Sequence, residues 1–294
     1  MDHEIIYDKR THLGEGIYWD DRTEAYYFVD IMRKEFHRLK DGEDTLLHTF
    51  DDFVGFTVPT EDGRFMVGCG KDLLLYDPET DTFEKKFSVD GEFSDNRFND
   101  GKATPDGRII AGTMNNALNE DDFAPNSDTG GLFSIKAGEE PIRLMSGKKV
   151  PNGLAFSKDN KRMFHTDTFS QTIKEYAYDE KTGKIEFLRD VVKIPEELGS
   201  PDGMTISDDD TIFAALWGGG AVAVIDTVKG EISELIKFPV LHVTCCAFGG
   251  KNLDELVVNT SAIESPEDKY PDAGKIFRLN VGKKGKKVDR FKID

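Results

Sequence analysis

The sequence is poor in cysteine: it has only Cys69, Cys245 and Cys246 among 294 residues. Three thiols cannot build a disulfide framework, and two adjacent cysteines on a strand would point to opposite faces. We therefore expect reduced thiols in a cytoplasmic protein. The first four residues, Met-Asp-His-Glu, have no basic or apolar region of a signal peptide, and the longest weakly polar stretch, 213–225, is too short and glycine-rich to span a bilayer.

Basic residues are also scarce. The chain has 38 Lys and Arg against 56 Asp and Glu, a formal net charge of −18. Such a surface repels phosphate backbones and anionic lipids, so neither a nucleic acid nor a membrane is an expected partner. Nothing in the sequence sets an oligomeric state, and a monomer is compatible with it.

Several catalytic motifs are missing as well. There is no G-x-S-x-G nucleophile elbow, no H-E-x-x-H and no Walker-type phosphate loop. The six histidines show no ligand spacing. His165 falls on an expected strand and is best interpreted as a packed side chain. His242, two residues before Thr244, could instead approach a substrate.

The sequence does contain a repeat. Short apolar strands alternate with polar turns in units of roughly 40–53 residues, the blade period of a β-propeller. The turns that mark the units lie at 20–22, 61–63, 105–107, 158–160, 208–210 and 249–251. Because each unit carries about four strands, we predict an all-β fold, a six-bladed β-propeller with a central metal site, in which residues 1–294 form a single domain.

One position of the repeat is polar in most units. The residues seven positions before a common point of each turn are Glu15, Gly55, Asn99, Asn152, Asp202 and Thr244. All six should lie near the start of the innermost strand of a blade, facing the channel axis. A lone Asn-Gly or Asp-Gly is more often a turn, but carboxylates and amides that recur in one phase would converge on the axis, where burial is costly without a partner.

These side chains offer only oxygen ligands. Such ligands suit Ca²⁺, Mg²⁺ or Mn²⁺, whereas Zn²⁺ generally prefers nitrogen and sulfur. Two carboxylates balance one divalent cation, and an incomplete protein shell leaves positions for water and substrate. The pattern therefore predicts one divalent metal ion at the mouth of the channel.

The same stretches resemble the regucalcin/gluconolactonase family, also called the senescence-marker-protein family. The specific motifs are Gly14-Glu15-Gly16, Asn96-Arg97-Phe98-Asn99-Asp100-Gly101-Lys102, Pro151-Asn152-Gly153-Leu154 and Pro201-Asp202-Gly203-Met204. The resemblance implies a propeller that binds one Ca²⁺ or Zn²⁺ through Glu15, Asn152 and Asp202. It also implies that Arg97 and Asn99 contact the substrate and that Asp202 is the general base.

The sequence departs from the family at one place. In the animal gluconolactone-hydrolysing branch an acidic residue follows Gly-Thr-Met closely, and here Ala117 stands at that place. This departure weakens the case for a sugar lactone as the natural substrate but not the case for hydrolysis. The polar stretch 115–129 predicts a long loop above the channel, which either shapes specificity or is simply mobile.

The functional hypothesis is a metal-dependent lactonase. The metal, most readily Ca²⁺, would polarise the lactone carbonyl, and Asp202 or a water on the metal would start the attack. Arg97 would orient the substrate, or else form a salt bridge inside the channel. Strand alternation predicts that Asp100 faces away from the metal, and Asp167, fifteen residues after Asn152, is a candidate support. Phosphotriester hydrolysis and non-catalytic Ca²⁺ binding remain alternatives.

Overall fold

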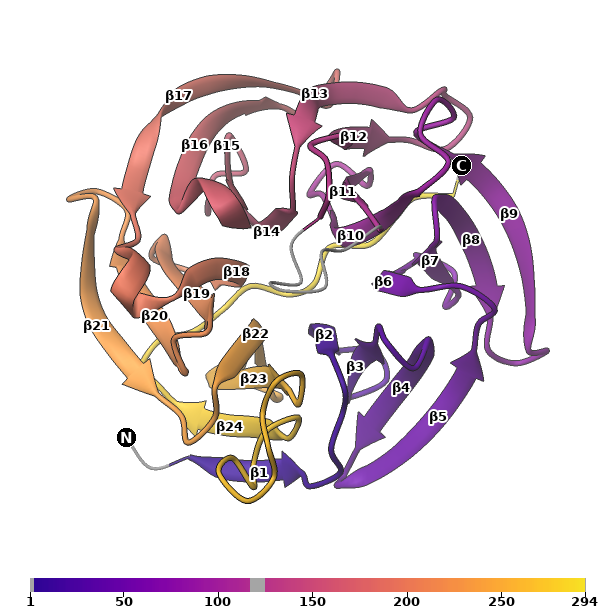
Figure 1. Cartoon of the computed structure of the whole chain (residues 1–294). Coiled ribbons are helices and arrows are strands. Elements are labelled where there is room, and N and C mark those ends of the chain that lie inside the picture. The colour runs from indigo at the N-terminus through magenta and orange to yellow at the C-terminus, as the bar shows by residue number, and fades with distance from the viewer. Residues whose placement is uncertain (1–2, 117–124, 294) are drawn as a thin grey trace.

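The computed structural model describes residues 3–116 and 125–293, and it arranges them as six four-stranded sheets around a channel (Figure 1). All strand pairs are antiparallel, and the ranges described contain no α-helix, only the short 3₁₀ turns η1 (Thr168–Ser170) and η2 (Glu196–Leu198). The predicted all-β, six-bladed propeller is confirmed. Within these ranges no helix is long and apolar enough to cross a membrane.

The inner half of each blade consists of two strands. The strands that line the channel are β2 (Gly14–Asp20), β6 (Val54–Pro59), β10 (Asn96–Ala103), β14 (Pro151–Phe156), β18 (Ser200–Ile206) and β22 (His242–Gly249). Their partners are β3 (Ala25–Asp30), β7 (Phe65–Cys69), β11 (Ile109–Asn115), β15 (Arg162–Asp167), β19 (Thr211–Trp217) and β23 (Glu255–Ser261). Each inner strand contacts the inner strands of both neighbouring blades, which closes the ring.

The outer half of each blade completes the sheet. The third strands are β4 (Glu35–Lys40), β8 (Asp72–Asp77), β12 (Gly130–Ile135), β16 (Thr172–Asp179), β20 (Ala221–Asp226) and β24 (Ile276–Asn280). The outermost strands are β5 (Glu43–Thr49), β9 (Thr82–Ser88), β13 (Ile142–Lys148), β17 (Lys184–Lys193), β21 (Glu231–Lys237) and β1 (Glu4–Tyr7). The repeat found in the sequence is thus one four-stranded blade.

The sixth blade is completed from the other end of the chain. Its outermost strand is β1, which pairs antiparallel with β24 so that Glu4 lies opposite Arg278 and Ile5 opposite Phe277. In Figure 1 the N-terminal strand lies beside the last strand at the rim. Because β1 pairs with β24, the outer edge of β24 is covered, and strands from the two ends of the chain close the sixth blade.

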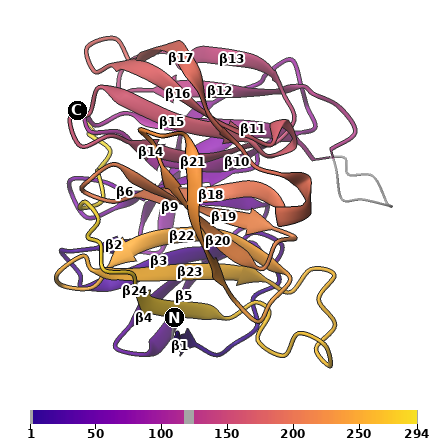
Figure 2. The same ribbon diagram turned by 90° about the vertical axis from the view of Figure 1, so that its left-hand side faces the viewer.

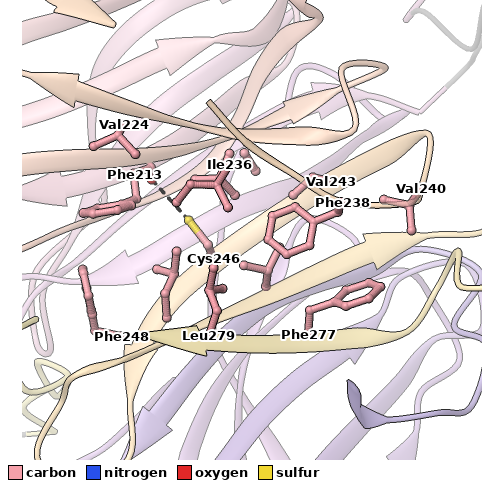
Figure 3. Close-up of a cluster of buried hydrophobic side chains, with 14 of the residues drawn as sticks. Phe213, Val224, Ile236, Phe238, Val240, Val243, Cys246, Phe248, Phe277 and Leu279 are labelled. Atoms are coloured by element: carbon pink, nitrogen blue, oxygen red, sulfur yellow. Dashed lines mark hydrogen bonds between the residues drawn. The ribbon is translucent and has the colours of Figure 1, made fainter. Parts of the chain in front are cut away.

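Apolar side chains fill the spaces between blades. Between the fifth and sixth blades the rings of Phe213 and Phe248 meet edge to face, with centroids 5.2 Å apart, and the thiol of Cys246 donates to the Phe213 carbonyl at 3.2 Å (Figure 3). Cys245 lies on the other face of β22 and lines the channel. All three cysteines are free thiols, and the two neighbours point to opposite faces as predicted.

Residues 283–293, which we term the C-terminal strap, cross the channel at the ends of the inner strands (Figures 1 and 2). The strap bonds to every blade, through Asp20 and Asp21, Pro59 and Glu61, Gly107, Phe156 and Ser157, Asp208, and Leu253. Phe291 anchors it, since its ring is only 2% exposed within the apolar cluster between the second and third blades. Nothing in the repeat predicts this segment.

Charge complements these contacts. Arg290 lies 2.6 Å from Asp20 and 2.5 Å from Asp21, and Lys287 lies 2.6 Å from Asp21. Hydrogen bonds first from Arg290 and then from Lys287 lower the pKa of Asp21 to about 2. The basic strap therefore neutralises acidic turns that the sequence places at the same end of the channel.

A cavity of about 110 Å³ lies between the strap and the starts of the inner strands. Its wall includes Asp100 and Lys102 of β10, and Lys286 and Asp289 of the strap. Burial raises the pKa of Asp289 to about 6, although Lys286 and Lys102 act in the opposite direction. The ionised form of this carboxyl therefore opposes folding.

The substitution Asp289→Asn is expected to stabilise the protein at neutral pH. The carboxyl ionises near 3.8 in the unfolded chain and near 6 in the folded one, so it costs stability as the pH rises through that interval. We expect the variant to gain about 1–3 kcal/mol in free energy of unfolding at pH 7.5, and the gain to fade towards pH 4.

Thermal and urea unfolding at both pH values measure this gain, and Asp21→Asn is the matched control. Because the pKa of Asp21 is lowered, its ionised form stabilises the fold, and the control should lose stability at pH 7.5. Equal destabilisation by both substitutions at pH 7.5 would contradict the account of Asp289.

Candidate metal centre at the mouth of the channel

Every inner strand has a β-bulge near its start. The register with the second strand shifts between Glu15 and Tyr18, Val54 and Phe56, Phe98 and Gly101, Asn152 and Leu154, Pro201 and Met204, and Val243 and Cys245. Each of the six ring positions predicted from the repeat lies at one of these bulges. A bulge re-aims side chains locally, which is how consecutive polar residues can face the channel.

Local geometry explains the glycines that accompany the ring. Gly153 has φ +50°, and a Cβ on it would lie 2.6 Å from the Asp202 carbonyl oxygen, so a side chain cannot be accommodated. At the ring position of β6, a Cβ on Gly55 would lie 2.5 Å from the Asn99 carbonyl oxygen. The neighbouring strand thus leaves no room for a ligand in the second blade.

The ring residue of the sixth blade also contributes no ligand, because it joins two blades. Thr244 donates its hydroxyl to the Gly14 carbonyl at 2.5 Å, next to Glu15 on β2. The side chains left to converge on the channel mouth are those of the first, third, fourth and fifth blades.

The structure brings the three predicted metal ligands to one end of the channel. Glu15, Asn152 and Asp202 are 8%, 5% and 5% exposed. The Asn152 amide donates to Asp202 Oδ1, and also to Thr168 Oγ1 at 3.2 Å. Glu15 Oε2 accepts a hydrogen bond from the Gly16 amide at 2.9 Å. These contacts fix the side chains of Asn152 and Asp202 against each other, while Asn152 Oδ1 accepts from the Gly153 amide at 3.2 Å.

The buried carboxylates repel one another. Burial, followed by the charge of Asp100, raises the pKa of Glu15 to about 8. Burial, followed by the charges of Glu15 and Asp100, raises the pKa of Asp202 well above its usual range. Buried carboxyls that disfavour one another's ionised forms are stabilised by a bound cation. Among the described residues no three His, Cys, Asp or Glu side chains gather to hold a metal by themselves, so the fit to a divalent ion rests on two carboxylates, Glu15 and Asp202, together with the amide oxygen of Asn152.

The prediction for Asp100 was wrong. Strand alternation placed it away from the metal, but the bulge between Phe98 and Gly101 turns it towards the channel, where it lines the cavity. Lys102 follows it in the channel and donates to the Leu154 and Met204 carbonyls at 2.7 and 3.0 Å. The sequence signal for both was the Asp-Gly pair that follows Asn99, since glycine within a strand is typical of a bulge.

Arg97 and Asn99 form one hydrogen-bonded group on β10. Arg97 donates to Asn99 Oδ1 at 3.2 Å, to the Phe98 carbonyl at 2.9 Å and to Asn116 Oδ1 at 3.1 Å, all of them uncharged oxygens. The Asn99 amide donates to the Pro151 carbonyl at 3.1 Å, beside Asn152. Burial lowers the pKa of Arg97 to about 10, against the influence of nearby carboxylates. The guanidinium is therefore a buried cation beside the proposed ligands.

Two histidines lie near the mouth. His165 is 2% exposed and its Nδ1 lies 3.3 Å from the Gly153 carbonyl, which agrees with the packed side chain predicted. His242 stacks on Trp217 with ring centroids 3.8 Å apart, and its Nδ1 accepts from the Gly218 amide at 3.1 Å. Burial lowers the pKa of both imidazoles to about 4, so both are neutral near pH 7. A substrate role for His242 stays a prediction.

The loop predicted above the channel is only partly covered by the ranges described. Asn116 binds Arg97 as above, and its amide donates to the Asp95 carbonyl at 2.8 Å. Ala117, which marks the departure from the animal enzymes, lies outside the described residues together with 118–124. The link between this loop and specificity therefore stays a prediction.

Comparisons with known proteins agree with the fold. The family model described as "SMP-30/Gluconolactonase/LRE-like region" matches residues 13–262. Pentonolactonase XacC of Haloferax volcanii is 33% identical over 292 residues, which cover 96% of this chain and 95% of that protein. Regucalcin of Macaca fascicularis is 31% identical over 291 residues, with the same coverage of 96% and 95%.

A solved structure gives the same picture at lower identity. The calcium-binding protein regucalcin from Agrobacterium tumefaciens is 23% identical, has a TM-score of 0.90 and covers 99% of this chain and 97% of that one, a likeness that shows the fold. The family model spans most of the chain, and one of the relatives above is named as a lactonase. The chain belongs to the SMP-30/gluconolactonase/LRE-like family, as its sequence motifs predicted.

Proposed function

We propose that this protein is a divalent-metal-dependent hydrolase that opens a small lactone, with residues 1–294 working as one domain. The observation that carries the proposal is the meeting of two buried carboxylates, Glu15 and Asp202, with the amide of Asn152 at one end of the channel. The family supports it, because its members include proteins named as lactonases. Free thiols fit action in the cytoplasm.

Glu15, Asn152 and Asp202 would hold the ion. Their ligand atoms are oxygens, which favours Ca²⁺ and is compatible with Mg²⁺ or Mn²⁺, while Zn²⁺ is the less typical occupant. When bound, a divalent ion supplies a Lewis acid for the lactone carbonyl and a positive charge against the developing oxyanion. The protein's own side chains would orient the substrate and transfer the proton.

Arg97 and Asn99 would orient the substrate. Their side chains are already fixed to each other and to backbone carbonyls, so they present preorganised donors to the lactone oxygens. Asp202 would take a proton from the attacking water on Oδ2, since Oδ1 accepts from Asn152. The water oxygen bonds to the carbonyl carbon, the ring C–O bond breaks, and Asp202 returns the proton to the departing alkoxide.

Proton release from a panel of lactones tests the proposal. Protein stripped with chelator should be inactive towards five- and six-membered lactones, with and without sugar hydroxyls, and adding back Ca²⁺, Zn²⁺, Mg²⁺ or Mn²⁺ one at a time should restore turnover. The panel ranks metal and substrate together. It also shows whether an aldonolactone, which the pentonolactonase relative makes a natural candidate, is preferred.

Two outcomes would replace the proposal. Metal-dependent release from a phosphotriester, with every lactone inert, would assign the site to P=O chemistry. Tight metal binding without turnover of either class would instead identify a non-catalytic binding protein.

A further inference from the structure

Two carboxylates, Asp30, which is fully buried, and Asp167, which is partly buried, hold the backbone just ahead of two proposed metal ligands. Asp30, at the end of β3, accepts from the amides of His12 at 2.7 Å and Leu13 at 3.1 Å. Asp167, at the end of β15, accepts from the amides of Lys149 and Val150, each at 3.0 Å. In both cases the two carboxylate oxygens accept from the amides of two successive residues, and Asp30 Oδ1 also accepts from the Arg33 amide at 3.3 Å.

The two arrangements occupy the same place in their blades. Asp30 pairs with Gly14 and Asp167 with Pro151, so each lies opposite the residue that precedes a ligand, Glu15 or Asn152. In the other four blades, the residue that pairs with the position just before the ring residue has no carboxylate. These residues are Cys69, Thr113, Leu216 and Thr260. Only the first and fourth blades carry the carboxylate.

The first and fourth blades face each other across the channel. In the ring β2 and β14 are separated by two inner strands on either side, and Figure 1 shows them on opposite sides of the axis. Glu15 and Asn152 therefore approach the axis from opposite directions. The span between their ligand atoms depends on where the chain enters β2 and β14, which is the segment that the two carboxylates hold.

We propose that Asp30 and Asp167 are positioning residues of the metal site, and we term them the carboxylate clamps. The inference rests on the metal site of the proposed function. Each clamp fixes two successive amides so that the next residues enter the bulge with the ligand aimed at the axis. Thr168, adjacent to Asp167, extends the second clamp by accepting from the Asn152 side chain at 3.2 Å.

Calorimetric titration of the chelator-treated full-length protein with Ca²⁺, and separately with Zn²⁺, tests the clamps. Asp30→Asn and Asp167→Asn keep the size of the side chain but turn an NH₂ group towards one amide donor. The Kd of each variant is expected to rise by about 10- to 100-fold, as for groups that orient metal ligands elsewhere. At saturating metal, lactone turnover should return towards the wild-type kcat.

Asp20→Asn is the matched control. Asp20 is fully buried in the first blade and binds the Arg22 amide at 3.0 Å and Arg290 at 2.6 Å, but it lies at the strap end of β2. This variant should lose thermal stability and keep the wild-type Kd. The comparison separates positioning of a ligand from general support of the blade.

Wild-type Kd values in both clamp variants, whatever their melting temperatures, would overturn the inference. Should one variant not fold, the other supplies the same test from the opposite blade. Failure of the wild-type protein to bind either ion would overturn the proposed function as well. The two failures are distinguished because the first is seen in the wild-type protein alone, whereas failure of the clamps is a wild-type Kd in the variants.

Discussion

Asp202→Asn is expected to abolish lactone turnover and to leave the metal-free propeller at least as stable as the wild type. Loss of the proton acceptor and of one charged metal ligand should lower kcat by about 10³-fold or more. Stability should hold, because the lost charge is buried and repelled by Glu15 and Asp100. The amide oxygen at position 202 can still accept from Asn152, which keeps the local hydrogen bond.

Turnover, circular dichroism and thermal unfolding, all with and without metal, measure the two halves of this prediction. Asp208→Asn serves as the control, since Asp208 is an exposed acid at the other end of the same strand pair. Near-normal kcat in the Asp202 variant would remove Asp202 as the base. A large loss of stability without metal would show that its charge supports the fold.

Truncation after Val281 is expected to produce the largest loss of stability. It removes the strap, whose bonds reach all six blades, and it uncovers the apolar cluster around Phe291. Phe291→Ala alone should cost about 3–5 kcal/mol, the range for a large buried aromatic side chain. The reason is that the six blades are separate sheets with no shared ladder of hydrogen bonds, and the strap ties the ends of their inner strands together.

Urea unfolding of the truncated chain, of Phe291→Ala and of Lys284→Ala measures these losses, which should be largest for the truncation and smallest for Lys284→Ala. Lys284 is exposed and contributes its backbone carbonyl rather than its side chain, so its variant should resemble the wild type. Wild-type stability in the truncated chain would mean that the inner strands close the ring unaided.

The repeat predicted the architecture because one blade is one local unit of sequence. The six turns, the strands after them and the phase of Glu15, Asn152 and Asp202 all follow from contacts within about 50 residues of chain. The pairing of β1 with β24 and the course of the strap join residues more than 250 positions apart, and neither segment repeats. The four lysines among residues 283–287, in a chain with net charge −18, were the hint that this end meets acidic turns.

Within the site, the sequence predicted which side chains converge but not how the backbone aims them. Asp100 was misplaced because alternation assumes a regular strand, and the bulge interrupts it at that residue. Asp30 was missed although it lies fifteen residues after Glu15, the same separation that links Asp167 to Asn152. A search for acidic residues at a fixed separation from the ring positions would have found both clamps.

The pairing of β1 with β24 also determines when the propeller can close during synthesis of the chain. β1 leaves the ribosome long before its partner β24, because Ile276–Asn280 is made more than 250 residues later. The early blades can assemble as the chain emerges, whereas the ring stays open and β1 waits for its partner. A growing chain halted before residue 276 is therefore a propeller that cannot close.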